Sequence, residues 1–600
     1  MRIKLSEYIA QFMVDHDVDH VFTVTGGGAM HLNDSFGHKK ELRCIYNHHE
    51  QASAIAAEGY ARLTGKVALV CVTTGPGGTN AITGVIGGWQ DSIPMFIVSG
   101  QVKRETTTWS TDVPLRQLGD QEFQIIEVAK HMTKYAVMVT DAKEIRYHLE
   151  RAWYLCNHGR KGPVWIDVPS DIQAAIIETD ELKAYDPKED SGEVPVYDTA
   201  LTGKIIEKIR EAKRPVILAG TGVRLAEAYE IFHDAINKLE IPVVTAWNAH
   251  DLMEDEDPCY VGRPGSVGTR GGNFVVQNAD LLLVLGCRMN IRMISYNYKA
   301  FAKNAYKIVV DIDEAELRKP TVNVDMPVHA DLKDVLTDIC NALTGEKGSK
   351  PVAGDHAEWL NWCRNINSRY PADLPSYYGA EKLNPYVFIK QFTNILDPGE
   401  VVVCGNGGAC VITFQAAVVK KEQRLFTNSG CAAMGYGFPA AIGACIARDN
   451  KRTICIDGDG SFMMNIQELQ TVRYNNLNLK IFIINNNGYH SIRQTQTNLF
   501  NPPLVGVCDG NGISFPDFEK VAYAFDIPYV RIENEADISD RTKSVLETGG
   551  PVLCEVIVDE KQNFEPKLSS RRLDDGTMVS PEIDDMYPFL SREEYEAAHL

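Results

Sequence analysis

The sequence predicts an α/β protein made of three doubly wound parallel-sheet domains and a C-terminal tail. Short β-branched runs such as "HVFTVT" and "VALVCVTT" alternate with helical patterns such as "QASAIAAEGYARLTG", which is typical of βαβ units around a parallel sheet. This alternation occurs in three blocks. The first block contains "GPVWIDVP" near its end and the third closes on "GPVLCEVIVD", so we expect a duplicated unit on either side of a different middle domain.

Changes in this pattern set the expected domain boundaries. The first domain, 1–180, precedes an acidic stretch, "ETDELKAYDPKEDSGEVPVYD", that is typical of a linker. The middle domain, 195–345, contains "RPVILAGTGV", and the third, 375–560, contains "VVVCGNGGA". The tail, 561–600, lacks periodicity but carries several large apolar side chains, so we expect it to pack onto the body as a lid; a disordered tail is the alternative.

Composition narrows the class of partner and the compartment. With 600 residues, 44% hydrophobic and 23% charged, the chain can bury several cores, and its net charge of −20 argues against a nucleic-acid partner. No secretory signal and no uncharged run of membrane-spanning length is readable. The 14 cysteines are scattered without C-x-x-C pairs, which indicates reduced thiols in a cytoplasmic protein.

The third block carries a candidate metal site. In "ICIDGDGSF" a buried strand ends and a helix begins, which directs helix N-terminal amides beyond the sheet edge and favours an anion there. The next strand, "LKIFIINN", returns parallel and brings Asn486 to the same edge as Asp459. The carboxylate of Asp459, the amide oxygen of Asn486 and the carbonyl of Gly488 would form half of an octahedral Mg²⁺ shell, and a diphosphate would help to complete it.

This Gly-Asp-Gly turn with the following asparagine resembles the thiamine diphosphate (ThDP) binding motif, and nearly the whole chain resembles the acetolactate synthase (acetohydroxyacid synthase) large subunit. The resemblance implies pyrimidine-binding, central and diphosphate-binding domains, in that order, with ThDP and Mg²⁺ as cofactors. It implies decarboxylation of a 2-oxo acid such as pyruvate and transfer of the acetyl unit to a carbonyl acceptor. It also implies a homodimer or homotetramer with active sites between subunits.

The resemblance assigns cofactor contacts to this chain. Glu50 in "NHHEQASA" corresponds to the catalytic glutamate, which would hydrogen-bond pyrimidine N1′ and promote loss of the thiazolium C2 proton. Asn80 and Gly407 correspond to contacts with the cofactor, and Met434 corresponds to the bulky residue that holds it bent, with an ordinary core methionine as the alternative. The remaining implied contacts lie around the two strand ends: Gly458, Gly460, Ser461, Gly488, Tyr489 and His490.

Three further residues are candidates for catalysis. Gln101 in "SGQV" and Lys134 in "HMTKYA" match polar residues near the family's active site, although Lys134 is equally compatible with a surface lysine. His31 falls in the first βα turn, from which a side chain can reach the site; a capping or solvent-facing histidine is the alternative.

Two departures from the synthase pattern concern the acceptor. Asp120 replaces a phenylalanine of the substrate pocket, and Thr495 replaces a tryptophan that selects a small second oxo acid. Because both changes add polarity and remove bulk, we expect a larger, hydroxylated acceptor, as in the relatives that act in nucleotide-sugar and polysaccharide pathways. His31, Tyr489, His490 and Arg493 are candidates for handling it, and Arg493 either binds a phosphate or pairs with an acid.

Other functions stay open at this stage. Acetolactate formation from two pyruvates is the first alternative, and hydrolytic cleavage of a cyclic dione is the second; a non-catalytic role is disfavoured because Glu50, Asp459 and Asn486 are intact. The middle domain resembles the family's FAD-binding domain, but Asn290 and Ile291 replace an acidic pair, so a flavin-free or nucleotide-binding domain is the alternative. The flavin-like segments contain Gly220, Gly222, Arg288, Arg292, Asp311 and Asp313.

Overall fold

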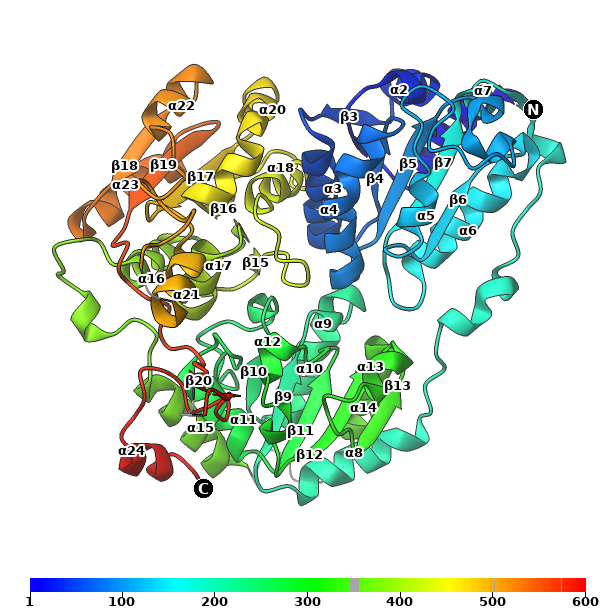
Figure 1. The fold of residues 1–600 in the computed structure, drawn as a ribbon. Coiled ribbons are helices and arrows are strands. Elements are labelled where there is room, and N and C mark those ends of the chain that lie inside the picture. The colour runs from blue at the N-terminus through cyan, green and yellow to red at the C-terminus, as the bar shows by residue number, and fades with distance from the viewer. Residues whose placement is uncertain (346–355, 501, 573–574) are drawn as a thin grey trace.

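The computed structural model describes residues 1–345, 356–500, 502–572 and 575–600. It contains three large sheets, each parallel throughout and packed between helices (Figure 1). The first and third of these α/β units lie side by side, and the middle one lies below both in this view. The prediction of three parallel-sheet domains is therefore confirmed. Within the described residues, no helix has the length and apolar composition that a bilayer span needs.

The first sheet has the strand order β3-β2-β4-β5-β7-β6. Its strands are β2 (His20–Thr23), β3 (Arg43–Tyr46), β4 (Ala68–Val72), β5 (Met95–Gln101), β6 (Tyr135–Met138) and β7 (Val164–Pro169). Its helices are α1 (Leu5–Asp15), α2 (Met30–His38), α3 (Glu50–Thr64), α4 (Pro76–Asp91), α5 (Ile125–Ala129), α6 (Ile145–Asn157) and α7 (Ser170–Gln173). A small antiparallel pair, β1 (Arg2–Lys4) with β8 (Ile176–Glu178), closes the unit.

The middle sheet has the order β10-β9-β11-β12-β13. Its strands are β9 (Pro215–Ala219), β10 (Val243–Thr245), β11 (Leu281–Leu285), β12 (Tyr306–Asp311) and β13 (Met326–His329). Its helices are α8 (Ala200–Glu211), α9 (Gly222–Leu225), α10 (Tyr229–Leu239), α11 (Arg270–Asn278), α12 (Ile291–Ile294), α13 (Glu314–Arg318), α14 (Leu332–Gly345) and α15 (Ala357–Arg369).

The third sheet has the order β15-β14-β16-β17-β19-β18, which repeats the order of the first sheet strand for strand. Its strands are β14 (Val401–Cys404), β15 (Arg424–Phe426), β16 (Thr453–Gly458), β17 (Leu479–Asn485), β18 (Tyr529–Ile532) and β19 (Val552–Ile557). Its helices are α16 (Pro385–Ile395), α17 (Gly408–Ala416), α18 (Gly437–Ala447), α19 (Asp459–Phe462), α20 (Leu469–Tyr474), α21 (His490–Leu499), α22 (Phe518–Ala524) and α23 (Ile538–Glu547). This shared order supports the duplication expected from the repeated strand phrase.

Helices α3 and α18 join the first and third units (Figure 1). Their backbones approach closely, because a Cβ at Gly59 would lie 2.4 Å from the carbonyl oxygen of Ala440 and a Cβ at Gly443 would lie 1.8 Å from that of Ala56. Buried side chains of both units form one hydrophobic cluster across this contact. The first and third units therefore share a core, which fixes the position of the start of α3 relative to the third sheet.

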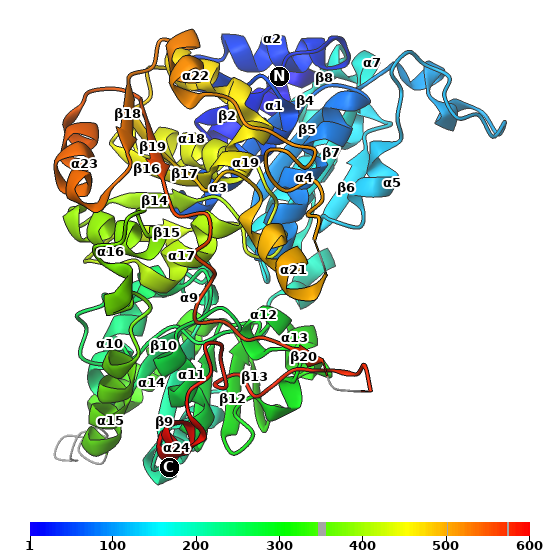
Figure 2. The ribbon, with the colours of Figure 1, turned by 60° about the vertical axis from the view of Figure 1, so that its left-hand side comes forward.

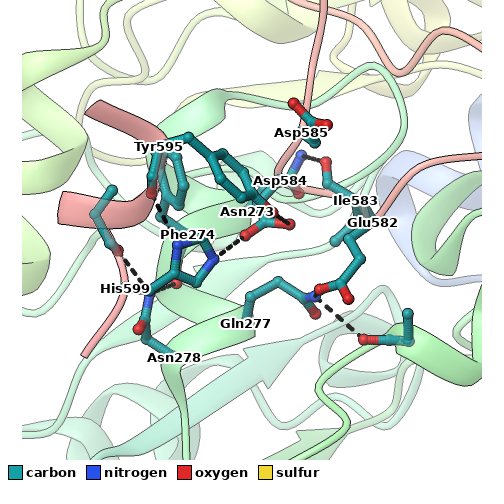
Figure 3. Close-up of polar contacts among 12 residues, drawn as sticks. Asn273, Phe274, Gln277, Asn278, Glu582, Ile583, Asp584, Asp585, Tyr595 and His599 are labelled. Carbon is teal, nitrogen blue, oxygen red and sulfur yellow. Dashed lines mark hydrogen bonds and ion pairs between the residues drawn. The ribbon is translucent and has the colours of Figure 1, made fainter. Parts of the chain in front are cut away.

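The C-terminal tail leaves β19, contains β20 (Arg571–Arg572), β21 (Met578–Val579) and α24 (Arg592–Ala597), and packs onto the core of the middle unit through Ile583 and Ala598. Figure 3 shows α11 facing this segment. Asn273 Nδ2 donates to the carbonyl of Ile583 at 2.9 Å, and Asn278 Nδ2 donates to that of Ala598 at 3.0 Å. The carboxylate of Asp584 is fully buried and lies 2.7 Å from Nε2 of His599. The tail is thus packed on the body, and its action as a lid stays a prediction.

Candidate active site

Three adjacent strands of the third sheet end at the candidate site. Each is followed by a turn and a helix: β14 by α17, β16 by α19 and β17 by α21. From β14 the chain continues to β15 on one side of the sheet and then to β16 on the other side. Open α/β sheets bind ligands at the carboxyl edge of such a topological switch point. The turns therefore present backbone amides and polar side chains to one crevice.

Asp459 and the loop from Asn486 to Gly488 are in direct contact. Oδ2 of Asp459 accepts a hydrogen bond from Gly488 N at 2.9 Å, and Oδ1 accepts one from Gly460 N at 2.7 Å. The side chain of Asp459 is buried, and burial raises its pKa to about 7. Oδ1 of Asn486 is also buried, and it has no hydrogen-bond partner among the described residues.

This arrangement fits a divalent cation with oxygen ligands. The buried Asp459 carboxylate accepts hydrogen bonds from two backbone amides, but its raised pKa indicates that its negative charge is poorly compensated. The buried Asn486 oxygen has no donor within the described residues. Across the part of the chain that the structure describes, no cluster of three or more His, Cys, Asp or Glu side chains could hold a metal ion. One carboxylate, one amide oxygen and a backbone carbonyl are the kind of oxygen ligands that a hard cation such as Mg²⁺ accepts, and a bound group would supply further ligands.

The loop shape depends on glycine at position 488. Gly488 has a φ of +141°, and a Cβ there would lie 2.1 Å from the carbonyl oxygen of Val507. Asn487, immediately before it, has a φ of +55°. Only glycine meets both requirements at 488, and two successive positive φ values turn the chain sharply between β17 and α21.

Met434 lies half-buried in a segment tied to the same edge. Gly435 N donates to Ser461 Oγ at 2.9 Å, and Nδ2 of Asn406 donates to the carbonyl of Ala433 at 2.8 Å. The residues on both sides of Met434 are therefore held by the turns after β14 and β16. A role of Met434 in supporting a bound cofactor stays a prediction.

Tyr489 and His490 follow the loop. The ring of Tyr489 covers Gly460, where a Cβ would meet it at 2.3 Å. His490 is buried, and burial, followed by the charge of Arg493, lowers its pKa to about 4, so its imidazole is neutral near pH 7. Its Nε2 has no partner within the described residues.

Glu50 begins α3 at the carboxyl edge of the first sheet and is partly exposed. Nδ2 of Asn80, on α4, donates to Oε2 of Glu50 at 3.0 Å. The start of α3 also contacts the third unit, because Asn465 Nδ2 donates to Gln51 Oε1 at 3.1 Å and Glu468 accepts from His48 N at 2.9 Å. Glu50 is thus oriented within its own unit and held against the third.

The other proposed catalytic side chains occupy different positions. Gln101 is 2% exposed and its amide is used inside the first unit: Nε2 donates to the carbonyl of Phe123 and to Asp167, and Oε1 accepts from Val102 N. Lys134 precedes β6 at the amino edge of the sheet, opposite Glu50, and donates to the carbonyl of His158 at 2.7 Å. Catalytic roles for both stay predictions, and the structure does not bring them to Glu50.

His31 lies in the first turn of α2 and is partly buried; burial, followed by the charge of Lys4, lowers its pKa. Asp120 is exposed on the segment between β5 and α5, which extends from the body in Figure 2. Thr495 is exposed on α21, where its hydroxyl donates to the carbonyl of Ser491 at 3.0 Å. Arg493, two residues earlier, points inward to backbone carbonyls rather than outward.

Sequence reasoning missed several residues that shape the site. Glu468 holds the residues before Glu50, since its carboxylate also accepts from Asn47 Nδ2 at 2.9 Å. Glu122 organises the segment between β5 and α5 by accepting from the amides of Thr108, Leu118 and Gly119. These partners of Glu468 lie in the first unit, and those of Glu122 lie in an irregular segment of its own unit, so neither residue type nor spacing indicated them.

The middle unit carries a cavity of about 240 Å³ at the carboxyl edge of its sheet. Gly220, Gly222, Arg288 and Asp311 line it, and burial raises the pKa of Asp311 to about 6. Asn290 is used as the N-cap of α12, accepting from Met293 N at 3.1 Å. Most of the flavin-like segments therefore gather around one cavity, which also touches the first unit.

Three family models match the chain in order: thiamine pyrophosphate enzyme, N-terminal TPP binding domain, over residues 3–128; the central domain, over 202–339; and the C-terminal TPP binding domain, over 405–556.

Curated relatives align over nearly the full chain. The acetolactate synthase large subunit of Cyanidium caldarium is 31% identical over 574 residues, covering 94% of each chain. Acetolactate synthase isozyme 1 large subunit of Escherichia coli (strain K12) is 29% identical over 566 residues, covering 94% of this chain and 95% of that protein. A probable acetolactate synthase large subunit of Methanococcus aeolicus is 32% identical over 561 residues, covering 90% of each.

Proposed function

The chain belongs to the thiamine pyrophosphate enzyme family and is an enzyme of the acetolactate synthase type, and from this premise we propose a specific reaction. It decarboxylates a 2-oxo acid, pyruvate, and joins the two-carbon acetyl unit to a carbonyl acceptor. The observation that carries this proposal is the contact between Asp459 and the Asn486–Gly488 loop, where the Asn486 side-chain oxygen is buried and has no partner among the described residues.

Mg²⁺ and ThDP are the proposed cofactors. Asp459, Asn486 and the carbonyl of Gly488 would hold the metal, and the metal would bind the diphosphate of the cofactor. ThDP supplies a carbon nucleophile and an electron sink for the decarboxylation. Glu50 would hydrogen-bond the pyrimidine and hold the proton that is exchanged there, while Asn80 keeps its carboxylate oriented at 3.0 Å. Met434, Tyr489 and the glycine turns would shape the space around the cofactor.

A second copy of the chain is proposed to complete each site. In the family the pyrimidine-binding domain of one subunit faces the diphosphate-binding domain of another, which implies a homodimer or homotetramer. The first unit has apolar side chains available for such a contact. Trp109, Val113, Leu115, Leu118 and Phe123, all on the segment between β5 and α5, are at least 41% exposed. Apolar surface of this kind is typical of a protein interface.

Pyruvate is the first acceptor to consider, because the relatives named above are acetolactate synthases. A keto-sugar nucleotide is the second candidate. It is favoured by Asp120 and Thr495, which are both exposed polar residues at positions where the synthase pattern has an aromatic one. Removal of aromatic bulk enlarges a pocket, and added polar groups suit a hydroxylated acceptor.

The cavity of the middle unit is proposed to hold a flavin or another nucleotide. The glycine turns after β9 and β11, the guanidinium of Arg288 and the buried Asp311 suit a ligand that carries phosphate and hydroxyl groups. Asn290, however, is occupied as a helix cap. The absorption spectrum of the purified protein tests this directly: flavin bands identify FAD, and release of a colourless nucleotide on denaturation identifies the alternative.

The reaction is tested by incubating the purified protein with ThDP, Mg²⁺ and pyruvate, alone and with a panel of aldehydes, 2-oxo acids and nucleotide-linked 4-keto-sugars. Mass spectrometry identifies the product and a coupled assay follows CO₂. Acetolactate from pyruvate alone supports the first acceptor, and a branched sugar supports the second. The absence of CO₂ release in every mixture would contradict the proposal, and ring opening of a cyclic dione without CO₂ would replace it by hydrolysis.

A further inference from the structure

Arg493 is directed into the protein at the loop that carries the proposed metal ligands. It lies in the first turn of α21, and its side chain is 13% exposed. Nη2 donates to the carbonyl of Asn486 at 2.8 Å, and Nη1 donates to that of Asn487 at 3.1 Å. Nη2 also donates to the carbonyl of Glu560 at 3.1 Å, in the segment that follows β19. One guanidinium therefore joins the loop, α21 and the segment that follows β19.

From these contacts we infer that Arg493 is a positioning residue for the metal site: it holds the Asn486–Gly488 loop in the shape that leaves the buried Asn486 Oδ1 available to a divalent cation. The Gly488 carbonyl, which accepts from His490 N at 3.0 Å, has a second lone pair for the same cation. This inference rests on the proposed function, because it takes that loop to be the metal-binding loop. It assigns to Arg493 a role in the protein interior and not in binding the acceptor.

The loop needs such support because its backbone is unusual. Asn487 and Gly488 have φ values of +55° and +141°, so the chain reverses within two residues. Residues 486 and 487 lie beyond the end of β17, where their carbonyls have left the sheet ladder. The planar guanidinium can bind several carbonyls at fixed angles, which a lysine ammonium does not reproduce. Arg493 thus supplies donors that the strand no longer provides.

The guanidinium is also covered on the tail side. His490 Nδ1 lies 3.3 Å from Nη2, and the His490 ring packs edge-on against Phe564 of the tail, with ring centroids 4.9 Å apart. Phe564 is 5% exposed and lies beside Gly408, at the start of α17. A partly shielded guanidinium with three carbonyl acceptors has little capacity left for a substrate phosphate.

A simple acid pair does not explain the position of Arg493. The nearest carboxylate contact is Oε2 of Glu560 at 3.9 Å, which is beyond hydrogen-bond distance and is 38% exposed. The three carbonyl contacts are shorter by 0.8 to 1.1 Å (3.9 − 3.1 and 3.9 − 2.8). The backbone of the loop, and not an acid, is therefore the principal partner.

Whether removal of Arg493 weakens or tightens metal binding distinguishes a positioning role from a purely electrostatic one. A positive charge beside a cation site repels the metal, so its removal alone would tighten metal binding. If Arg493 acts by positioning, its removal weakens metal binding instead. Loss of groups that orient metal ligands typically weakens metal affinity by about 10- to 100-fold.

The experiment measures Mn²⁺ binding, as a probe for Mg²⁺, by electron paramagnetic resonance on the full-length protein with ThDP present. We expect Arg493→Ala to weaken Mn²⁺ affinity by about tenfold or more. Arg493→Lys should show nearly the same loss of affinity. Millimolar guanidinium ion, added to the Arg493→Ala protein, should restore its Mn²⁺ affinity. Arg541→Ala, at an arginine on α23 that is 48% exposed, is the matched control and should bind as the wild type does. Circular dichroism checks folding, and Arg493→Gln, expected to weaken binding as well, replaces the alanine variant if that does not fold.

The inference is overturned if the alanine or glutamine variant binds Mn²⁺ as tightly as the wild type, or if Arg493→Lys restores full affinity. Failure of guanidinium to restore binding in a folded Arg493→Ala protein also counts against it. A wild-type protein that binds no Mn²⁺ with ThDP would overturn the proposed function together with the inference. Normal wild-type binding with unaffected variants would overturn the inference alone.

Discussion

Asn80 holds the carboxylate of Glu50 through a hydrogen bond of 3.0 Å between the starts of two neighbouring helices, α4 and α3. Both helices begin at the carboxyl edge of the first sheet, so the pair faces the side on which a cofactor would bind. An amide that donates to one carboxylate oxygen leaves the other free to bind a ligand. The pair is therefore arranged as an oriented acid or base.

Glu50→Gln is expected to lower the rate of pyruvate decarboxylation by about 10²- to 10⁴-fold, because an amide keeps the shape of the side chain but does not exchange a proton. ThDP should still bind, since the proposed diphosphate contacts lie in the third unit. The rate is measured by CO₂ release and cofactor binding by isothermal titration calorimetry. Glu7→Gln, at an exposed glutamate on α1, is the control and should keep the wild-type rate. A Glu50→Gln protein with full activity would rule out this role.

Asn486→Leu is expected to abolish stabilisation by the cofactors without lowering the stability of the apo protein. Oδ1 of Asn486 is buried without a partner in the described chain, a situation that costs about 1–3 kcal/mol for a buried polar group. A leucine of similar size should therefore leave the apo protein at least as stable, while the stabilisation by ThDP with Mg²⁺ is lost. Thermal unfolding with and without both cofactors measures this. Asn304→Leu, at an exposed asparagine, should keep the cofactor-dependent shift. Retention of that shift by Asn486→Leu would exclude Asn486 as a ligand.

Arg62 lies at the centre of a buried polar cluster between the first and third units. Its Nε donates to Glu58 at 3.1 Å and its Nη2 donates to Asp91 at 2.8 Å, while Tyr436 from the third unit donates to Glu58 at 2.6 Å. Glu58 is fully buried. Arg62→Met should destabilise the protein by about 3–5 kcal/mol, because it leaves a buried carboxylate without its cation.

Urea denaturation checks this value. The matched control is Arg318→Met, which removes an arginine from a pair with Glu314 at the same i,i+4 spacing but on an exposed surface. That change should cost less than about 1 kcal/mol. Replacing Glu58 and Arg62 together by apolar residues should recover part of the lost stability, and no recovery would mean that the unpaired charge is not the cause.

The Asp584–His599 pair joins two parts of the tail, and we expect it to make the stability of the folded tail dependent on pH (Figure 3). The hydrogen bond to Asp584 is the main cause that raises the pKa of His599 above its ordinary value of 6.5. A histidine whose pKa is raised by folding stabilises the folded state fully below the unfolded pKa, and this stabilisation is lost as the pH rises through the folded pKa. Because His599 is partly exposed, we expect a contribution of up to about 1 kcal/mol.

The stability difference between wild type and His599→Gln should therefore be larger at about pH 5.5 than at about pH 8, as measured by urea denaturation at each pH. His38→Gln is the control, because His38 also contacts an aspartate, Asp34, but its side chain is 85% exposed. It should show a smaller dependence. A His599→Gln difference that grows with pH would have the wrong sign and would contradict the assignment.

The sequence was informative wherever a local rule determined the geometry. Parallel strands end at a common edge, so the contact between Asp459 and the residues after β17 follows from the order of strand, turn and helix. The inward position of Gln101 and the carbonyl contacts of Arg493 depend on segments far away in the chain. Neither residue type nor spacing indicates such partners, because most glutamines and arginines face solvent.

The acceptor can be tested at Thr495. Its side chain is exposed and its hydroxyl bonds only to the carbonyl of Ser491 on its own helix, so Thr495→Trp should change the free energy of unfolding by less than about 0.5 kcal/mol. If this position faces the acceptor, the indole reduces the space, and the ratio of acetolactate to larger products should rise by about tenfold or more. Competition between pyruvate and a larger carbonyl acceptor measures the ratio. Thr497→Trp is a matched control. Thr497 is also exposed, and its hydroxyl donates to the carbonyl of Arg493 on the same helix at 2.8 Å. Its side chain points to another side of α21. Equal ratios in the two variants would show that Thr495 does not select the acceptor.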